Sequence, residues 1–199
     1  MNVAHASLVG SAVWLALALA GCHGGKPDGA TGSDRFGVDR LYPLRTGSVW
    51  AYDVETGDGP PTLAITRVTA NNAGQVDVSS SGTPMRYEQR SDGLYRSDRG
   101  SYVFKLPLRV GAHWDAGLGA TTEVVSVDAQ VKTVAGDFTG CVELRETGGE
   151  TPKVVRSVFC PDVGLVELES SMNLPVSGGG ARVVARLRGY DFAAALAAP

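Results

Sequence analysis

The chain has 199 residues, of which 43% are hydrophobic and 20% are charged, with a formal net charge of −3 at pH 7. This length allows one domain with a sizeable hydrophobic core, and the slightly acidic balance argues against a nucleic-acid-binding protein. The 26 glycines, with abundant Val and Thr, favour strands joined by tight turns over long helices.

The first 22 residues have the pattern of an export signal. Residues 1–21 contain no Lys, Arg, Asp or Glu, and residues 8–20 (LVGSAVWLALALA) form a mostly apolar run. A membrane-spanning helix needs about 20 apolar residues, so this shorter run fits a signal-peptide core. Residues 19–22 (LAGC) follow and resemble the bacterial lipobox, in which the cysteine thiol takes a diacylglycerol before cleavage. The resemblance implies a signal peptide over 1–21 and lipid attachment at Cys22.

A lipid on Cys22 would hold the mature protein on a membrane of the cell envelope. Each buried CH₂ contributes ~0.8 kcal/mol, so three acyl chains would give lasting anchoring. The next residue is His23 and not Asp, which predicts the outer membrane if the cell has one. Residues 1–7 contain no Lys or Arg, which indicates either a misplaced start codon or a weak but working signal.

Residues 22–38 are polar and Gly-rich without hydrophobic periodicity, which predicts a flexible tether between the lipid and a domain. A β domain is expected over residues 39–192. The Ala-rich residues 193–199 would form a short helical or frayed C-terminal tail.

In the first half of the domain, Trp50 and Tyr52 are predicted to share one face of a strand, with charged residues on the other. This strand should end at residues 57–61 (GDGPP), because Gly and Pro interrupt the hydrogen-bonded ladder. Further strands are expected over residues 62–69, 75–80 and 84–90.

In the second half, apolar and polar residues alternate more regularly. The residues predicted to face the core are Val125, Val127, Ala129 and Val131 in one strand, Val166 and Leu168 in a second, and Val183, Ala185 and Leu187 in a third. Such alternation is typical of a half-buried sheet. We therefore predict an all-β fold, a single antiparallel meander that forms a strongly curved sheet or an incomplete barrel.

With Cys22 modified by lipid, Cys141 and Cys160 remain as a pair in an oxidising compartment. They flank a predicted hairpin with its turn over residues 149–152, and this register places them directly opposite each other. A cross-strand disulfide would then contribute about 3 kcal/mol. The same register sets Arg145 against Arg156, a mildly unfavourable pair. Metal binding by the two thiols is the alternative, but it lacks further ligands, so no metal is expected.

One short repeat is visible. Residues 43–50 (PLRTGSVW) and 107–114 (PLRVGAHW) match at five of eight positions, 64 residues apart. In each copy Pro-Leu precedes a Gly that permits a sharp bend, and a Trp begins a strand. Because the flanking sequences do not match, we interpret the repeat as a reused corner rather than as a duplicated domain.

Three segments resemble a loose group of uncharacterised bacterial lipoproteins: residues 42–52 (YPLRTGSVWAY), 135–141 (AGDFTGC) and 161–166 (PDVGLV). The third usually reads PGVGLV in that group, so Asp162 departs from it. The resemblance implies a lipid-anchored, β-rich domain without an established activity. In architecture, the expected fold is also similar to that of curved-sheet lipoproteins that carry lipids or lipoproteins through the envelope.

Two chemical patterns have structural and functional interpretations. Glu167 and Glu169 point the same way, which would suit an enzyme with paired carboxylates. However, the next strand carries a row of arginines, so we favour exposed cross-strand ion pairs worth ~0–1 kcal/mol each. The arginines are Arg182, Arg186 and Arg188. His113 is the only histidine in the predicted domain, and a hydrolase using it would still need a placed nucleophile.

Trp50, Tyr52 and Trp114 are the candidate ligand-binding residues. They would either fill the ends of the core or line the mouth of a cavity for an apolar ligand. We predict a noncatalytic envelope lipoprotein, without a cofactor, that binds an amphiphile or a partner protein. The alternatives are an envelope hydrolase using His113 and a structural or assembly accessory lipoprotein.

Overall fold

A computed structural model describes residues 35–57, 59–149, 153–174 and 179–192; the predicted signal peptide, Cys22 and the tail 193–199 lie outside these ranges. The described residues contain one short helix, α1 (Val38–Leu41), and strands that follow each other along the chain. The strands are β1 (Val49–Glu55), β2 (Thr62–Asn72), β3 (Gln75–Ser80), β4 (Thr83–Arg90), β5 (Gly93–Arg96), β6 (Ser101–Lys105), β7 (His113–Gly117), β8 (Ala120–Thr133), β9 (Gly136–Gly148), β10 (Lys153–Cys160), β11 (Gly164–Leu174) and β12 (Gly179–Asp191).

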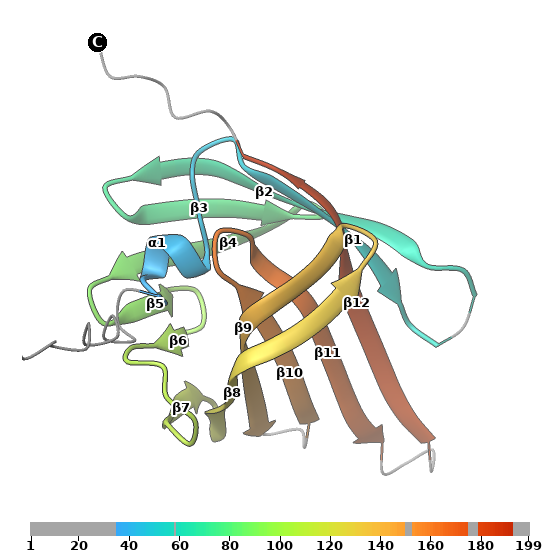
Figure 1. Cartoon of the computed structure of the whole chain (residues 1–199). Coiled ribbons are helices and arrows are strands. Elements are labelled where there is room, and N and C mark those ends of the chain that lie inside the picture. The colour runs from blue at the N-terminus through green and yellow to red at the C-terminus, as the bar shows by residue number, and fades with distance from the viewer. Residues whose placement is uncertain (1–34, 58, 150–152, 175–178, 193–199) are drawn as a thin grey trace, which may run out of the picture.

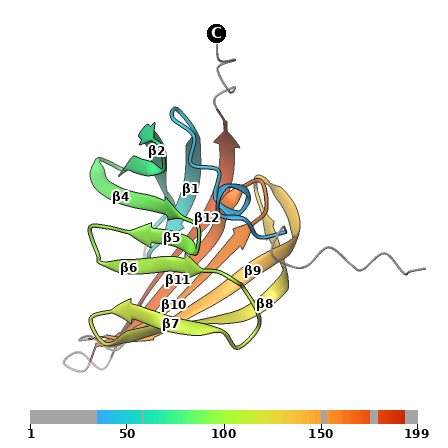
Figure 2. The same ribbon diagram turned by 90° about the vertical axis from the view of Figure 1, so that its left-hand side faces the viewer.

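All these strands belong to one antiparallel sheet in the order β6-β5-β4-β3-β2-β1-β12-β11-β10-β9-β8-β7. The first strand pairs with the last, and β6 and β7 are left as the two edges. The sheet curves until these edges face each other, which gives a nearly closed barrel with one unsealed seam (Figure 2). The predicted all-β meander in an incomplete barrel is confirmed.

One end of the barrel is plugged by α1 and the residues around it (Figure 1). Phe36, Leu41 and Tyr42 are buried in the core. On the helix surface, Asp39 accepts a hydrogen bond from Gln89 Nε2 at 2.7 Å, which ties α1 to β4. Residues 36–38 therefore belong to the folded domain, although the sequence placed them in the tether.

The burial of side chains along β8 departs from the predicted alternation. Val124 is fully buried, whereas Val125, which was expected to face the core, is only half-buried. The pairing of β8 with β9 shifts register between Val124 and Ser126 and at two later points. Because side chains alternate strictly along a strand, each bulge exchanges the faces of all residues beyond it.

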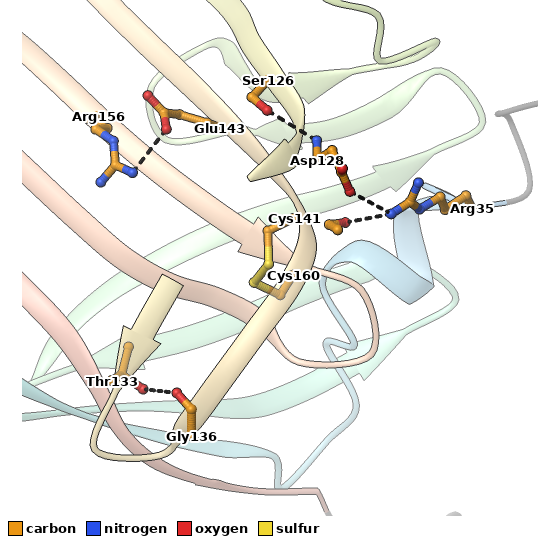
Figure 3. Close-up of a disulfide and its surroundings, with 10 residues drawn as sticks. Arg35, Ser126, Asp128, Thr133, Gly136, Cys141, Glu143, Arg156 and Cys160 are labelled. Atoms are coloured by element: carbon orange, nitrogen blue, oxygen red, sulfur yellow. Dashed lines mark hydrogen bonds and ion pairs between the residues drawn. A yellow bond between two sulfur atoms is a disulfide. The ribbon is translucent and has the colours of Figure 1, made fainter. Parts of the chain in front are cut away.

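The β9–β10 hairpin has the predicted register, with Lys153 opposite Gly148 and Arg156 opposite Arg145. The like charge is compensated because Arg156 forms an ion pair with Glu143 at 2.9 Å (Figure 3) and another with Glu167. A disulfide with an S–S distance of 2.01 Å joins Cys141 to Cys160 at the end of this hairpin.

The predicted cross-strand ion pairs between β11 and β12 are also present. Glu169 pairs with Arg182 at 2.7 Å, and Glu167 pairs with Arg186 at 3.0 Å. Arg188 pairs instead with a residue of β1, Asp53, at 2.9 Å. These contacts explain both the acidic and the basic side chains without a catalytic role.

The outer half of the β8–β9 hairpin crosses over the ends of β10 and β11 towards β12 (Figure 1). There, Ala135 N donates to Leu187 O at 3.3 Å. Arg35 lies beside the same hairpin, 3.5 Å from Asp128 and 3.5 Å from the Gly140 carbonyl (Figure 3). The first described residue is thus held close to the disulfide and to α1, at the plugged end.

Candidate functional site

Two of the predicted ligand-binding residues, Trp50 and Tyr52, lie in the packed core. The Trp50 indole is fully buried and donates to Val163 O at 2.7 Å, and the Tyr52 hydroxyl donates to Leu165 O at 3.0 Å. The Trp50 ring also meets the Tyr42 ring edge to face, with centroids 5.1 Å apart. These contacts hold β1 to the β10–β11 turn, so both residues fill the core instead of lining a cavity.

The same turn explains two positions in the sequence motif of residues 161–166. A Cβ at Gly164 would come within 2.6 Å of the Tyr42 ring, so that ring requires a glycine beneath it. Asp162 has φ +64°, a left-handed conformation that favours glycine. Its carboxylate compensates by accepting hydrogen bonds from the Arg40 guanidinium at 3.0–3.1 Å. Residues 161–166 therefore help to build the plugged end of the barrel.

Trp114, the third predicted residue, lies at the seam. Its side chain is 9% exposed, and its Nε1 donates to Tyr102 O on β6 at 3.3 Å. This hydrogen bond runs from one sheet edge to the other, where the backbones do not form a ladder. Trp114 thus connects the two sheet edges across the seam through its side chain, and it does not line the interior pocket.

His113 is exposed at the start of β7. Its Nδ1 lies 3.3 Å from the Gly111 carbonyl oxygen, which is its hydrogen-bond contact among the described residues. Asp115, two residues along the strand, accepts instead from Gly117 N at 2.7 Å. The hydrolase hypothesis needs a nucleophile and an orienting group beside this imidazole, and the described part of the chain brings neither to it.

The interior of the barrel contains a pocket of about 160 Å³ that the sequence did not indicate. It lies between the two halves of the sheet, with lining residues from β4–β6 on one side and β8–β11 on the other. Its apolar wall consists of Val103, Val155, Phe159, Leu165 and Leu168.

The rest of the pocket wall is polar. Hydroxyl groups come from Ser101 on β6, Thr122 on β8 and Ser157 on β10. Tyr42 and Tyr87 also line it, and burial raises the pKa of both phenols above the ordinary value of 10.0; the Tyr87 hydroxyl donates to Met85 Sδ at 3.5 Å. The pocket can therefore offer hydrogen bonds as well as apolar contacts to a small ligand.

A wider pocket of about 610 Å³ adjoins the inner one at the end of the barrel opposite α1. Arg99 and Glu146 line both pockets, so they mark the passage between them. We call this wider pocket the mouth of the barrel. Its apolar residues are Ala116, Leu118, Ala120 and Met172. The Leu118 side chain is 78% exposed, and an aliphatic side chain so exposed at a pocket rim is suited to contact a ligand or a membrane.

Charged side chains at the mouth are mostly paired. Arg96 donates to both carboxylate oxygens of Asp98 at 2.9–3.1 Å, and these hydrogen bonds hold the pKa of Asp98 below its ordinary value. Glu146 forms an ion pair with Lys153 at 3.0 Å. Arg99 lines the same pocket and adds a further positive charge to it; among the described residues no carboxylate lies within 4.0 Å of its guanidinium.

Sequence reasoning missed these residues for a physical reason. Arg99 lies in the β5–β6 turn, Thr122 in β8 and Glu146 in β9, and no spacing pattern connects such distant positions. The one local signal was the charged turn of residues 98–100 (DRG), which resembles any solvated turn.

Neither a metal cluster nor a membrane-spanning helix is found in the described ranges. No group of three or more His, Cys, Asp or Glu side chains is arranged there to hold a metal ion. In the same residues, no helix combines the length and the apolar character needed to cross a membrane.

No family model and no curated protein matches the chain. Among solved structures, it is similar to an inferred exported protein with a YmcC-like fold from Bacteroides fragilis NCTC 9343, with 14% identity over 77% of this chain and 99% of the other, and a TM-score of 0.52. An inferred lipoprotein from Parabacteroides distasonis ATCC 8503 is 12% identical over 76% of this chain and 98% of its own, with a TM-score of 0.46. At these identities the first likeness shows a shared fold and nothing further.

Proposed function

We propose that this protein is a noncatalytic lipoprotein of the cell envelope that binds a small amphiphile inside its barrel. The observation that carries the proposal is the pair of pockets, a narrow one that reaches Tyr42 at the plug and a wide one at the opposite end of the barrel. The wide pocket has the size typical of small-molecule sites, and both pockets combine apolar walls with a few polar groups.

The position of Arg35, the first described residue, supports a tethered arrangement. Arg35 lies at the plugged end, and residues 22–34 could span at most about 45 Å when extended. A lipid on Cys22 would therefore attach through the plugged end and leave the mouth at the far end accessible. The Bacteroides fragilis protein that shares the fold is an inferred exported protein, which supports a location outside the cytoplasm.

The binding test uses the mature chain, residues 23–199, purified from a bacterial periplasm. Native mass spectrometry followed by solvent extraction and lipid analysis is expected to detect a bound amphiphile. Val155→Phe, which fills the inner pocket, should remove this ligand. Val154→Phe is the matched control, because the Val154 side chain on the same strand is 42% exposed.

Thermal melting of both variants separates loss of the ligand from loss of the fold. A ligand-free mass in the unsubstituted protein would contradict amphiphile binding. The partner-protein form of the hypothesis would then be tested by crosslinking in the native envelope.

The anchor is tested separately from the pocket. In the full chain, Cys22→Ser should release the protein from the membrane fraction and remove the mass of the acyl groups. A variant that remains membrane-bound with unchanged mass would contradict lipid attachment at this residue, whatever the pocket binds.

A further inference from the structure

We propose that the ligand binds head first, with a small anionic head group such as a phosphate or a carboxylate in the inner pocket and its apolar chain in the mouth. This inference rests on the proposed function, because it names the chemistry and the orientation of the bound amphiphile. The head group is recognised by Arg99 and by the hydroxyls of Ser101 and Thr122.

Two hydroxyl groups on the wall of the inner pocket determine the orientation of the bound ligand. Ser101 is 8% exposed and Thr122 is 4% exposed, and both line the inner pocket. Among the described residues, Ser48 Oγ is the one buried side-chain oxygen or nitrogen without a partner, so the hydroxyls of Ser101 and Thr122 are not sealed off and can reach a ligand in the pocket. Burying an alkyl chain against such groups would remove them from water without replacing their hydrogen bonds, which is unfavourable. A head group with acceptor oxygens would satisfy both hydroxyls.

The charges around the passage determine the sign of the head group. Two positive and two negative side chains neutralise each other as Arg96–Asp98 and Lys153–Glu146 pairs. Arg99 lines both pockets and adds a further positive charge to them. A planar guanidinium is well suited to bind phosphate or carboxylate oxygens. An anionic head group would therefore be attracted to Arg99.

The volumes and the lining of the two pockets place the alkyl chain of the ligand in the mouth. The inner pocket, about 160 Å³, is smaller than a typical site for a whole ligand, while the mouth measures about 610 Å³. Leu118 and Met172 give the mouth two long apolar side chains. An alkyl chain there would cover Leu118, which is 78% exposed.

The experiment compares three probes on the delipidated mature protein by isothermal titration calorimetry at low ionic strength. The probes are decyl phosphate, decyl glucoside and inorganic phosphate, with each amphiphile below its critical micelle concentration. Decyl phosphate is expected to bind at least about tenfold more tightly than decyl glucoside, because a charged hydrogen bond is stronger than a neutral one. Inorganic phosphate should bind more weakly still, because it cannot use the apolar mouth.

Thr122→Val gives opposite results for the two orientations, since it removes a hydroxyl and keeps the side-chain shape. If the head group lies inside, the variant should bind decyl phosphate roughly tenfold more weakly. If the chain lies inside, the more apolar pocket should bind it more tightly. Ser101→Ala provides a second test of the same sign, and melting curves exclude a folding defect in either variant.

Arg99→Gln should weaken decyl phosphate about tenfold, leave decyl glucoside unchanged and reduce the salt dependence of binding. Arg109→Gln is the matched control, because Arg109 is also exposed but does not line the pockets. Tighter binding by Thr122→Val, or equal loss in both arginine variants, would overturn the head-first proposal. Equally tight binding of inorganic phosphate would overturn it too. The absence of binding by every probe and of any co-purified lipid would instead contradict the proposed function itself.

Discussion

The two copies of the repeat, residues 43–50 and 107–114, form two corners of the barrel. These corners have almost the same local structure but different surroundings. In each, the Gly of the repeat donates to a strand valine, Gly47 to Val68 O and Gly111 to Val124 O, both at 2.9 Å. Each valine donates back to the residue after that Gly, again at 2.9 Å. Each Trp lies opposite a buried Thr on the next strand. The eight-residue repeat therefore encodes a repeated hydrogen-bonded corner.

The strands beside the corners differ. At the first corner, β1 is paired along its length with β12, which runs from Gly179 to Asp191. At the second, β7 faces β6, which runs only from Ser101 to Lys105 and forms no ladder with it. Similar local sequence therefore produces the same bend, whereas sealing of the junction depends on the strand that lies beside the corner. The unsealed seam lies directly beside the inner pocket, which Ser101 and Thr122 help to line.

The largest expected difference concerns the two tryptophans. Trp50→Ala should lower the free energy of unfolding by about 5 kcal/mol, because it opens a cavity in a fully buried site and leaves Val163 O unpaired. Trp114→Ala should cost about 3 kcal/mol, since its indole is partly exposed and its hydrogen bond is longer. Urea unfolding of both variants measures this, and equal losses would contradict the comparison.

The second expected effect concerns the protection of backbone amides at the β1–β12 ladder and at the β6–β7 seam. Amides of β6 and β7 that face the seam should exchange with solvent about 100-fold faster than those in the β1–β12 ladder. Hydrogen exchange followed by mass spectrometry can resolve these peptides. Equal protection on both sides would show that the seam is sealed in solution.

A smaller effect should be the same at both corners. Gly47 and Gly111 have φ values of +88° and +83°, which L-residues adopt at a cost. Replacing either by Ala should therefore lower stability by roughly 1–2 kcal/mol. Thermal and urea unfolding of the two variants would reveal any inequality, which would mean that the corners are not energetically equivalent.

The smallest expected effect is a pH dependence. Hydrogen bonds from Arg182 lower the pKa of Glu169 on β11, and those from Arg90 lower the pKa of Glu88 on β4, relative to the ordinary 4.5. A depressed folded-state pKa means that the unfolded chain binds protons first, so these groups stabilise the fold above about pH 4.5 and lose that contribution as the pH falls. Carboxylate NMR titration should find both values below 4.5. Arg182→Gln should raise only that of Glu169.

Much of the second half could be predicted because its information is local. The hairpin register that places Lys153 opposite Gly148 follows from the turn position and the alternation of a few residues. In β8, Val127, Ala129 and Val131 pack against the core as predicted, but the face of Val125 could not be predicted, because it depends on the register shift between Val124 and Ser126 in the pairing with β9. For that reason Val124 occupies the buried position that the pattern assigned to Val125.

The candidate site was the least predictable part. Trp50 and Tyr52 attract attention in the sequence as large aromatic residues, but their polar atoms are used by the β10–β11 turn. The pocket is lined instead by residues such as Arg99 and Thr122, which have no distinguishing sequence pattern. Pocket residues come from many strands, so their proximity depends on closure of the whole sheet.

The sequence by itself determined most of the longer strands, the repeated corner and the register of the β9–β10 hairpin, since these depend on alternation, glycine conformations and short turns. The tertiary structure alone decided that β1 pairs with β12, that β6 and β7 remain apart, and that a pocket forms beside them. The reason is physical: local patterns specify which face of a strand is apolar, whereas closure depends on the summed twist and length of strands far apart in the chain.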